Sequence, residues 1–339
     1  MDETFFCMTE EHFSDLGKVG AIARLYEESP FKPFKNSSFE TSGKGTVRTR
    51  TRLFLEGIDF NLVYFPLKHL GYKAVTAVTG ELYADLSRPR VLTLRLGISA
   101  KLDFTQVREL WTGVLSAAKE HGYQDVDLDL APSVNGLTVC VSATGETSHL
   151  TEKRRPEPRS KDLLCVSGNL GGAFFGLQVL ERERRRFDTD RTAPDLEKYR
   201  MMVGSYLKPE ITPALPQLLE EADLLPSCGV LVTAGLAEAV KRIARSTGLG
   251  AKVYADKIPF EGNSFELGKE LNIDPISAAM NGGEDYRLLF VVPILKMEKF
   301  RRDFQTFDII GHLARPEAGS VLVSPDGVEF PLKAQGWPD

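Results

Sequence analysis

A charged, proline-broken segment at residues 152–161 divides the chain into two halves, and β-rich and helical patterns alternate in each half. A chain of 339 residues is long enough for two domains, since domains typically have roughly 100–200 residues each. Strands that interleave with helices favour α/β or α+β domains. We therefore predict an α+β protein with two domains, at residues 1–150 and 151–339.

The spacing of hydrophobic residues predicts the individual elements. The clearest is a helix at residues 104–121, in which apolar side chains recur along one stripe. The other helices are expected at residues 10–28, 67–86, 171–183, 213–223 and 234–247. The strands are expected at residues 90–96, 126–130, 137–143, 163–166, 229–232, 286–292 and 307–311. Residues 46–65 are expected to form two strands broken at Gly57, and residues 35–46 a polar loop.

Composition is ordinary for a soluble globular protein, and we expect the chain to be cytoplasmic. A net charge of −5 gives no general case for nucleic acid or an anionic membrane as partner. The basic cluster at residues 182–191 is diluted by acidic residues and reads as a solvated helix end. No apolar run approaches the ~18 residues of a membrane-spanning helix, and the N-terminal residues lack the pattern of a signal peptide.

The cysteines and histidines indicate neither a zinc site nor a disulfide framework. The four cysteines lie far apart without a CxxC pair, and the five histidines show no HExxH spacing. We expect buried, reduced thiols.

Three arginines alternate along a predicted strand. Arg48, Arg50 and Arg52 are separated by single residues and therefore share one face of the strand. They form either a solvated strand face or, because guanidinium groups bind phosphate in a bidentate manner, a binding surface for an anionic ligand.

Two glycine-containing segments are candidate ligand-binding turns. Gly168 and Gly171 lie between a predicted strand and a predicted helix, where backbone N–H groups favour phosphate; a plain strand-to-helix turn fits equally well. Residues 282–285 join a tight turn to the adjacent carboxylates Glu284 and Asp285. We expect this loop to contribute to a substrate cleft, and the sequence does not decide which carboxylate faces it. Trp337 either stacks on an aromatic ligand or covers an apolar patch.

Seven short motifs together resemble one known family. They are Gly57–Phe60, Pro66–Val75, Ser167–Gly171, Tyr206–Pro209, Gly235–Leu236, Gly282–Tyr286 and Gln335–Trp337. In this order and spacing the chain resembles the thiamine-monophosphate kinases, relatives of aminoimidazole ribonucleotide synthetase, over nearly its whole length. The resemblance implies the two-domain fold of that superfamily, a homodimer that pairs through the N-terminal domains, and a cleft between domains.

The resemblance also implies a reaction that needs a metal. The family transfers phosphate from ATP to thiamine monophosphate and uses Mg²⁺ held by aspartates. Here most of the matching positions carry other residues. Lys35 and Asn36 replace an Asp-Asp pair, Arg52 replaces another aspartate, and residues 231–236 have lost both of theirs. Gly235 is kept in that last segment and is a further candidate phosphate-binding residue. Glu81 and Asp129 are the remaining candidate metal ligands. The predicted metal site is therefore degenerate.

Three functions remain open from the sequence. The chain is a thiamine-monophosphate kinase with an unusual site that uses Glu81, Asp129 and one of Glu284 and Asp285. Alternatively, it is a non-catalytic paralogue that binds a nucleotide, thiamine phosphate or another anion through Arg48, Arg50 and Arg52, or a structural partner of an active homologue. Residues 30–46 remain an additional possible source of ligands.

Overall fold

Two β-sheets, one in each half of the chain, organise the computed structural model, which describes residues 13–27, 29–32, 41 and 45–334. The predicted domain boundary at residue 150 falls between the last strand of the first sheet, β4 (Thr138–Thr147), and the first strand of the second, β5 (Leu163–Ser167). The mixture of helices and sheets confirms the predicted α+β class.

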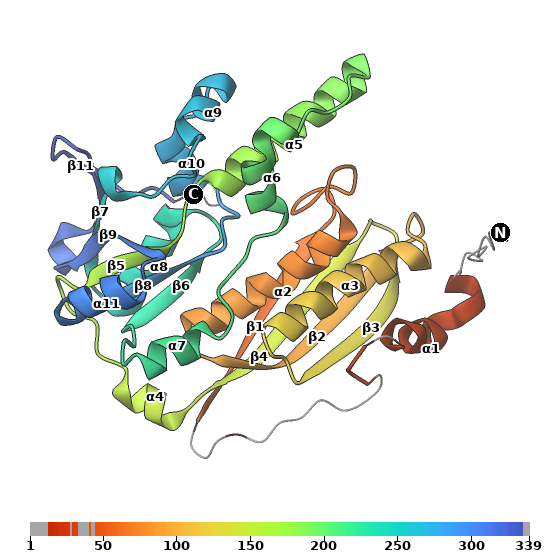
Figure 1. Cartoon of the computed structure of the whole chain (residues 1–339), viewed down its shortest axis with the longest axis horizontal. Helices are drawn as coiled ribbons and strands as arrows, with labels where there is room; N and C mark the ends of the chain where they lie inside the picture. Colours follow the sequence, from red (N-terminus) through yellow and green to blue (C-terminus); the bar gives the residue numbers. More distant parts are fainter. Residues whose placement is uncertain (1–12, 28, 33–40, 42–44, 335–339) are drawn as a thin grey trace, which may run out of the picture.

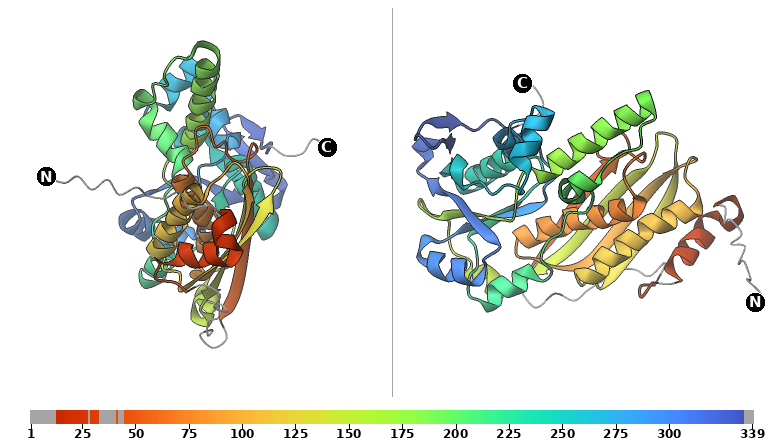
Figure 2. Two further views of the ribbon diagram at one scale, coloured as in Figure 1. Left: turned by 90° about the vertical axis from the view of Figure 1, so that its right-hand side faces the viewer. Right: turned by 45° about the horizontal axis from the view of Figure 1, so that its top comes forward.

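The N-terminal sheet has four strands in the order β1-β4-β2-β3. β1 (Thr46–Leu55) and β2 (Arg88–Ser99) both pair antiparallel with β4, and β3 (Asp125–Ser133) runs parallel to β2. The helices α2 (Leu67–Ala84) and α3 (Phe104–Glu120) cover one face of this sheet, while none of the described helices covers the opposite face (Figure 2). α1 (Phe13–Tyr26) packs at the β3 edge, where the Tyr26 hydroxyl donates to the Val126 carbonyl (2.6 Å).

The C-terminal sheet has seven strands in the order β11-β10-β7-β9-β5-β8-β6. Its remaining strands are β6 (Cys228–Val232), β7 (Gly250–Tyr254), β8 (Arg287–Val292), β9 (Phe307–Ala314), β10 (Ser320–Val323) and β11 (Glu329–Pro331). The α-helices of this half and its border are α4 (His149–Arg154), α5 (Gly172–Asp190), α6 (Arg200–Leu207), α7 (Leu215–Glu221), α8 (Leu236–Thr247), α9 (Ser264–Leu271), α10 (Pro275–Asn281) and α11 (Met297–Asp303). Short 3₁₀ turns are η1 (Glu197–Tyr199), η2 (Ala255–Lys257), η3 (Ile294–Lys296) and η4 (Pro316–Ala318).

The two halves share one hydrophobic core. Its larger cluster of buried residues joins Val78 of α2 to Leu231 of β6 and Phe290 of β8. α2 therefore has the N-terminal sheet on one side and the C-terminal domain near its end, as Figure 1 shows. α5 projects past the C-terminal sheet and lies near the start of α2. This arrangement brings the N-terminal segment after β1 close to α5 and to the turn before β8.

One sequence prediction is wrong in this region. Residues 46–65 contain one strand, β1, rather than two. Gly57 adopts a φ of 85°, and its N–H donates to the Phe60 carbonyl (2.8 Å), which closes a tight turn. The Leu55 N–H donates to the Asp59 carboxylate (2.8 Å). The chain is thus folded back on itself and keeps only an isolated bridge between Glu56 and Phe60.

Candidate functional site

A cavity of about 310 Å³ lies between the two halves of the chain. Residues 57–61 and Tyr64 form its N-terminal wall, and α5 forms the opposite wall with Leu177, Gln178, Glu181 and Arg185. Tyr206 and Glu284 complete the lining. The cavity therefore combines aromatic rings with side chains of both charges.

Glu284 connects this cavity to a buried lysine. One of its carboxylate oxygens lies 2.8 Å from the Lys73 ammonium, and the other lies 3.3 Å from the Arg52 guanidinium. Lys73 is only 1% exposed, and it also donates to the Tyr206 carbonyl (2.8 Å) and lies 3.9 Å from the centroid of the Tyr206 ring. Burial lowers the pKa of Lys73, and the nearby Glu284 carboxylate opposes that shift. Glu284 is thus held by two cations that reach it from the N-terminal domain.

The three arginines of β1 are also paired with carboxylates. Arg48 lies 2.7 Å from Glu152, Arg50 pairs with Asp85, and Arg52 lies between the rings of Phe54 and Tyr286 in addition to its contact with Glu284. The side chains of these arginines are half-buried, in contrast to the exposed residues between them. They share one face of the strand, and each is neutralised by the protein itself.

Glu81 and Asp129 are not brought together within the chain. Glu81 lies on α2, where its carboxylate is 3.7 Å from Arg50 and 3.5 Å from Arg242. Asp129 lies on β3 between Leu128 and Leu130, which are buried under the helices. Because side chains alternate along a strand, Asp129 points to the opposite, helix-free face of the sheet.

The described residues do not fit a divalent cation. Magnesium needs several oxygen ligands around one point. In the part of the chain that the structure describes, no group of three or more histidine, cysteine, aspartate or glutamate residues could hold a metal ion. Two of the candidate carboxylates, Glu81 and Glu284, contact arginine and lysine side chains instead.

Asp285 has a different role from its neighbour. Its side chain is buried and accepts hydrogen bonds from the N–H groups of Gly171 (2.9 Å) and Ala173 (3.2 Å) at the start of α5. Burial raises the pKa of Asp285 to about 7, against the effect of these two N–H groups. Glu284 therefore lines the cavity. Asp285 occupies the N-terminus of α5, which the sequence analysis gave as a candidate phosphate site.

The candidate glycines allow backbone conformations and close packing in this region. Gly171 has a φ of 77° and precedes α5, which lets its N–H point to Asp285. Gly235 has a φ of 100°, and a Cβ there would lie 2.4 Å from the Met280 carbonyl oxygen, so it allows α8 to pack closely on α10. Gly168 lies next to the Arg287 side chain. Trp337 and most of the possible ligand source at residues 30–46, including residues 35–36, lie outside the described residues.

Sequence reasoning missed Lys73, Tyr64, Tyr206 and Arg185 as site residues. Lys73 and Tyr206 lie inside motifs that supported the resemblance, but the motifs alone do not show that the lysine is buried. Tyr64 donates to Glu181 (2.6 Å) across the cavity, which joins two positions 117 residues apart. Nothing in the local pattern of either residue indicates that contact.

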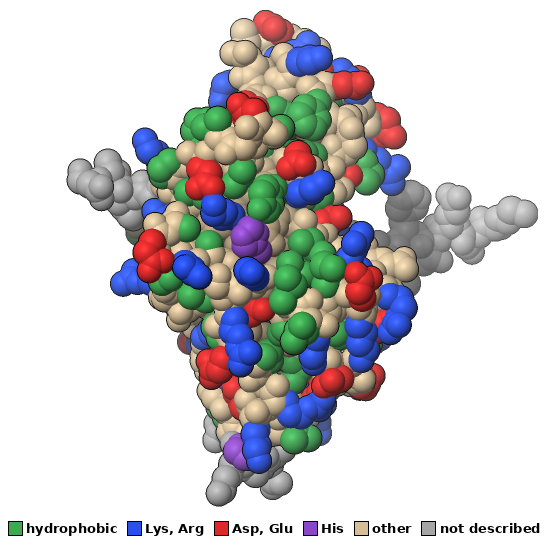
Figure 3. All heavy atoms as spheres, turned by 90° about the vertical axis from the view of Figure 1, so that its left-hand side faces the viewer, with side chains coloured by type: hydrophobic (Ala, Val, Ile, Leu, Met, Phe, Trp, Pro, Cys, Tyr) green, Lys and Arg blue, Asp and Glu red, His purple; other side chains and the backbone are tan. Residues whose placement is uncertain are grey.

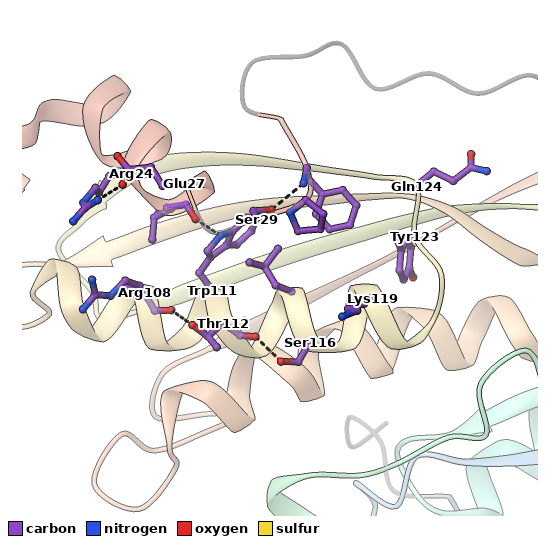
Figure 4. A pocket seen from close by; sticks show the side chains of 14 residues that line it. Arg24, Glu27, Ser29, Arg108, Trp111, Thr112, Ser116, Lys119, Tyr123 and Gln124 are labelled. Carbon is purple, nitrogen blue, oxygen red and sulfur yellow. Dashed lines mark hydrogen bonds and ion pairs between the residues drawn. The ribbon is translucent and has the colours of Figure 1, made fainter.

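A larger cavity, of about 900 Å³, lies elsewhere on the N-terminal half. It is lined by the end of α1 and one side of α3, and the Trp111 indole N–H donates to the Leu25 carbonyl (2.8 Å) at its base (Figure 4). None of the described site residues predicted from the sequence lines it.

Two further findings concern the chain as a whole. Among the described residues, no helix combines the length and apolar character needed to cross a bilayer. Cys140, Cys165 and Cys228 are free thiols, and Cys7 lies outside the described residues.

Solved structures of known proteins share this fold. Thiamine-monophosphate kinase from Stenotrophomonas maltophilia superposes with a TM-score of 0.71 at 21% identity and covers 90% of this chain and 94% of its own. The hydrogenase maturation protein HypE from E. coli superposes with a TM-score of 0.71 at 15% identity and covers 94% and 96%. AaThiL in complex with AMPPCP and TMP has a TM-score of 0.69 at 20% identity and covers 94% and 96%. The chain therefore has the fold that these proteins share, in agreement with the two-domain α+β fold that the resemblance implied.

Sequence comparison narrows this class. No family model matches the chain. The thiamine-monophosphate kinase of Aquifex aeolicus is 24% identical over 281 residues, which are 82% of this chain and 87% of that protein. The thiamine-monophosphate kinase of Pyrococcus horikoshii is 24% identical over 278 residues, 79% of this chain and 78% of that protein. The chain is thus similar to thiamine-monophosphate kinases over about four-fifths of its length, as its motifs predicted.

Proposed function

We propose that this protein binds a thiamine phosphate in the interdomain cavity and does not catalyse the metal-dependent transfer of phosphate from ATP. The main support for this proposal is that the carboxylates of the cleft pair with arginine and lysine side chains. Glu81 contacts Arg50 and Arg242, and Glu284 contacts Lys73 and Arg52. Both of these candidate metal ligands are thus already held by two side-chain cations.

The size of the electrostatic effect supports the loss of metal binding. Two unit charges about 4 Å apart interact with about 4 kcal/mol at an effective dielectric constant near 20. A divalent ion beside Arg52 would meet repulsion of this order, and every ~1.4 kcal/mol is a tenfold change in affinity. Phosphate transfer depends on cations that neutralise and align the phosphate oxygens. The paired arginines and lysine cannot bridge two phosphates in that way while they hold Glu81 and Glu284.

The composition of the cavity fits a zwitterionic ligand. Thiamine monophosphate combines a cationic aromatic ring with an anionic phosphate. Tyr64 and Tyr206 offer aromatic faces, which attract cations. Asp59 and Glu181 offer negative charge, and Arg185 offers a guanidinium group for phosphate. The complex of AaThiL with AMPPCP and TMP supports a ligand of this kind in the shared fold.

We expect the protein to bind thiamine monophosphate without converting it to thiamine diphosphate. With ATP, magnesium and thiamine monophosphate, we expect the purified protein to form no thiamine diphosphate at the rates of about 1–100 per second that are usual for kinases. Calorimetry should detect binding of thiamine monophosphate equally with magnesium and with EDTA. Kinase-like turnover would refute the loss of catalysis, and binding that requires magnesium would refute the metal-free site.

A variant of α5 tests the phosphate contact. Arg185→Gln is expected to weaken binding of thiamine monophosphate about tenfold, because a charge-assisted hydrogen bond is lost, and to leave binding of unphosphorylated thiamine unchanged. Arg186→Gln removes the same charge from the next, exposed residue, which does not line the cavity, and serves as the matched control. Equal effects of the two variants would place the phosphate elsewhere.

The second candidate function is that of a working thiamine-monophosphate kinase. It is favoured because the chain is similar to such kinases over about four-fifths of its length. It would use ATP and Mg²⁺ with Glu81, Asp129 and Glu284, and the turnover assay decides between the two. Direct binding of an anion by Arg48, Arg50 and Arg52 is less supported, since each already has a carboxylate partner.

We further propose that the protein is a homodimer in the cytoplasm, with the helix-free face of the N-terminal sheet as its interface. Val47 and Leu53 on this face are 46% and 49% exposed, and exposed apolar side chains on an uncovered sheet are typical of an interface. Light scattering is expected to give twice the chain mass of 37.6 kDa. Leu53→Lys should yield the single-chain mass, whereas a wild-type protein that is already monomeric would contradict the proposal.

A further inference from the structure

A second cavity, of about 750 Å³, opens on the outer side of the C-terminal sheet. Its floor is formed by β5 and β9, and its rim comes from η2, η3 and α11. Among the described residues, it shares no lining residue with the interdomain cavity. Figure 3 views the side of the molecule that carries β7, β9 and α11, and shows lysine and arginine side chains gathered around hydrophobic ones. Its volume lies within the range of about 300–1,000 Å³ that is usual for small-molecule sites.

Three cations from separate elements converge on this cavity. Lys161 precedes β5, Lys257 ends η2, and Arg301 lies on α11. Within the described ranges, Lys161 and Arg301 have no ion-pair partner, and Lys257 meets only its neighbour Asp256 at 3.5 Å. The three arginines of β1, in contrast, each pair with a carboxylate. Because Asp308 is the only carboxylate among the described residues that line it, the cavity has a net positive charge.

The backbone holds one of these cations in an uncommon conformation. Lys161 has a φ of 78°, a left-handed conformation that residues other than glycine rarely adopt. Its N–H donates to the Leu313 carbonyl (2.7 Å), which fixes the residue at the rim. Outliers of this kind concentrate at functional sites, where the surrounding structure holds them in place.

Aromatic side chains form one wall of the cavity. The rings of Tyr254 and His312 have centroids 5.8 Å apart and are inclined by 31°. Burial and the nearby Lys252 lower the pKa of His312, which favours the uncharged form of its ring. An uncharged ring next to a tyrosine offers a surface on which a planar ligand can stack.

We propose that this cavity binds a small phosphorylated ligand with a planar ring, of about the size of a mononucleotide. Lys161, Lys257 and Arg301 would contact the phosphate, and the Tyr254 and His312 rings would contact the planar group. No chemical step is involved. The site is independent of the interdomain cavity, and either proposal can fail without the other.

AMP is a suitable probe, because it carries both a phosphate and a planar ring. We expect AMP to protect Lys161 and Lys257 of the full-length protein from acetylation by an amine-reactive reagent, as measured by mass spectrometry. Lys241 on α8 is exposed and outside both cavities, so its modification should not change. Adenosine and inorganic phosphate should each protect much less than AMP. The readout is specific to this cavity even if AMP also binds between the domains.

A double variant tests the role of the cations. Lys257→Gln with Arg301→Gln is expected to abolish protection of Lys161 and to weaken AMP binding at this site about a hundredfold, about tenfold for each lost charge-assisted contact. Lys241→Gln with Arg245→Gln makes the same change of charge on exposed positions of α8 and should leave protection intact. The proposal is overturned if AMP does not protect Lys161 and Lys257, if adenosine or phosphate protects as well as AMP, or if both double variants behave alike.

Discussion

Replacing Glu284 with glutamine is expected to lower the free energy of unfolding by about 3–5 kcal/mol, because removing one partner of a buried ion pair leaves the other charge uncompensated. Lys73 is the charge in question: it is almost completely buried, and Glu284 is its only carboxylate contact among the described residues, at 2.8 Å. The pair joins α2 of one domain to the turn before β8 of the other. Urea unfolding monitored by circular dichroism measures the loss.

The double variant separates this pair from other contacts of Glu284. Lys73→Met alone leaves Glu284 with Arg52 at 3.3 Å, so it should cost less than Glu284→Gln. Lys73→Met with Glu284→Gln should be more stable than the sum of the two single losses, with a coupling of about 0.5–3 kcal/mol. Glu210→Gln breaks an exposed pair with Lys208 and should cost less than about 1 kcal/mol. A loss for Glu284→Gln no larger than that control would contradict the role assigned to the pair.

The effect should also depend on pH in a defined direction. Burial lowers the pKa of Lys73 below its unfolded value, and Glu284→Gln removes the carboxylate that opposes this shift. The folded variant then binds fewer protons than the unfolded chain, so its stability rises with pH toward the unfolded pKa of lysine. The loss caused by Glu284→Gln should therefore be smaller at pH 9 than at pH 6. An equal loss at both values would mean that Lys73 stays charged without its partner.

Local patterns were sufficient for the long elements of this fold. The apolar stripe of residues 104–121 corresponds to α3, whose residues Val107, Leu110 and Trp111 are buried. The alternation of arginines along residues 46–55 corresponds to the alternation of burial in β1. These elements bury one face, and a buried face requires apolar residues at regular intervals in the sequence.

The short elements have no such periodic pattern of apolar residues. The sequence did not indicate β7, β10 and β11, nor the helices α6, α9, α10 and α11. A helix of seven or eight residues is not stable alone and depends on tertiary packing. α10, for example, is capped by Asp274, whose carboxylate accepts from the Ser277 N–H (2.8 Å), and packs against α8 through Gly235. That packing partner lies about 40 residues earlier, where no local pattern refers to it.

The candidate site also combines features that the sequence predicted with features that depend on contacts between distant residues. Sequence comparison of motifs identified the loop with Glu284 and Asp285, but it could not assign one carboxylate to the cavity and the other to the start of α5. That assignment depends on contacts of Asp285 with Gly171 and Ala173, more than 100 residues away in the chain. The pairing of Glu284 with Lys73 spans a still longer separation. The loss of metal-binding aspartates is a prediction from the sequence, whereas the arginine and lysine side chains that pair with Glu81 and Glu284 are visible only in the structure.

Asp285 is expected to give the protein a pH dependence of stability that Asp285→Asn removes. The pKa of Asp285 is about 7 in the folded protein, above the value of about 3.9 for an aspartate in an unfolded chain. The folded state therefore keeps its proton to higher pH than the unfolded state does. The stabilisation is fully present below the unfolded pKa and is lost as the pH rises through 7. Between pH 5 and pH 8 the wild type should lose on the order of 2 kcal/mol relative to Asp285→Asn.

Two further variants isolate the cause of that loss. Asparagine keeps an oxygen that can accept the N–H groups of Gly171 and Ala173, whereas Asp285→Ala leaves both without an acceptor and should cost about 1–3 kcal/mol at every pH. Asp274→Asn makes the same substitution at the start of α10, where the carboxylate is exposed, and controls for the change of residue type. Chemical unfolding at pH 5, 6, 7 and 8 measures all four proteins. If the wild type and Asp285→Asn follow parallel curves, Asp285 is charged throughout this range, and the two N–H groups at the start of α5 outweigh the cost of its burial.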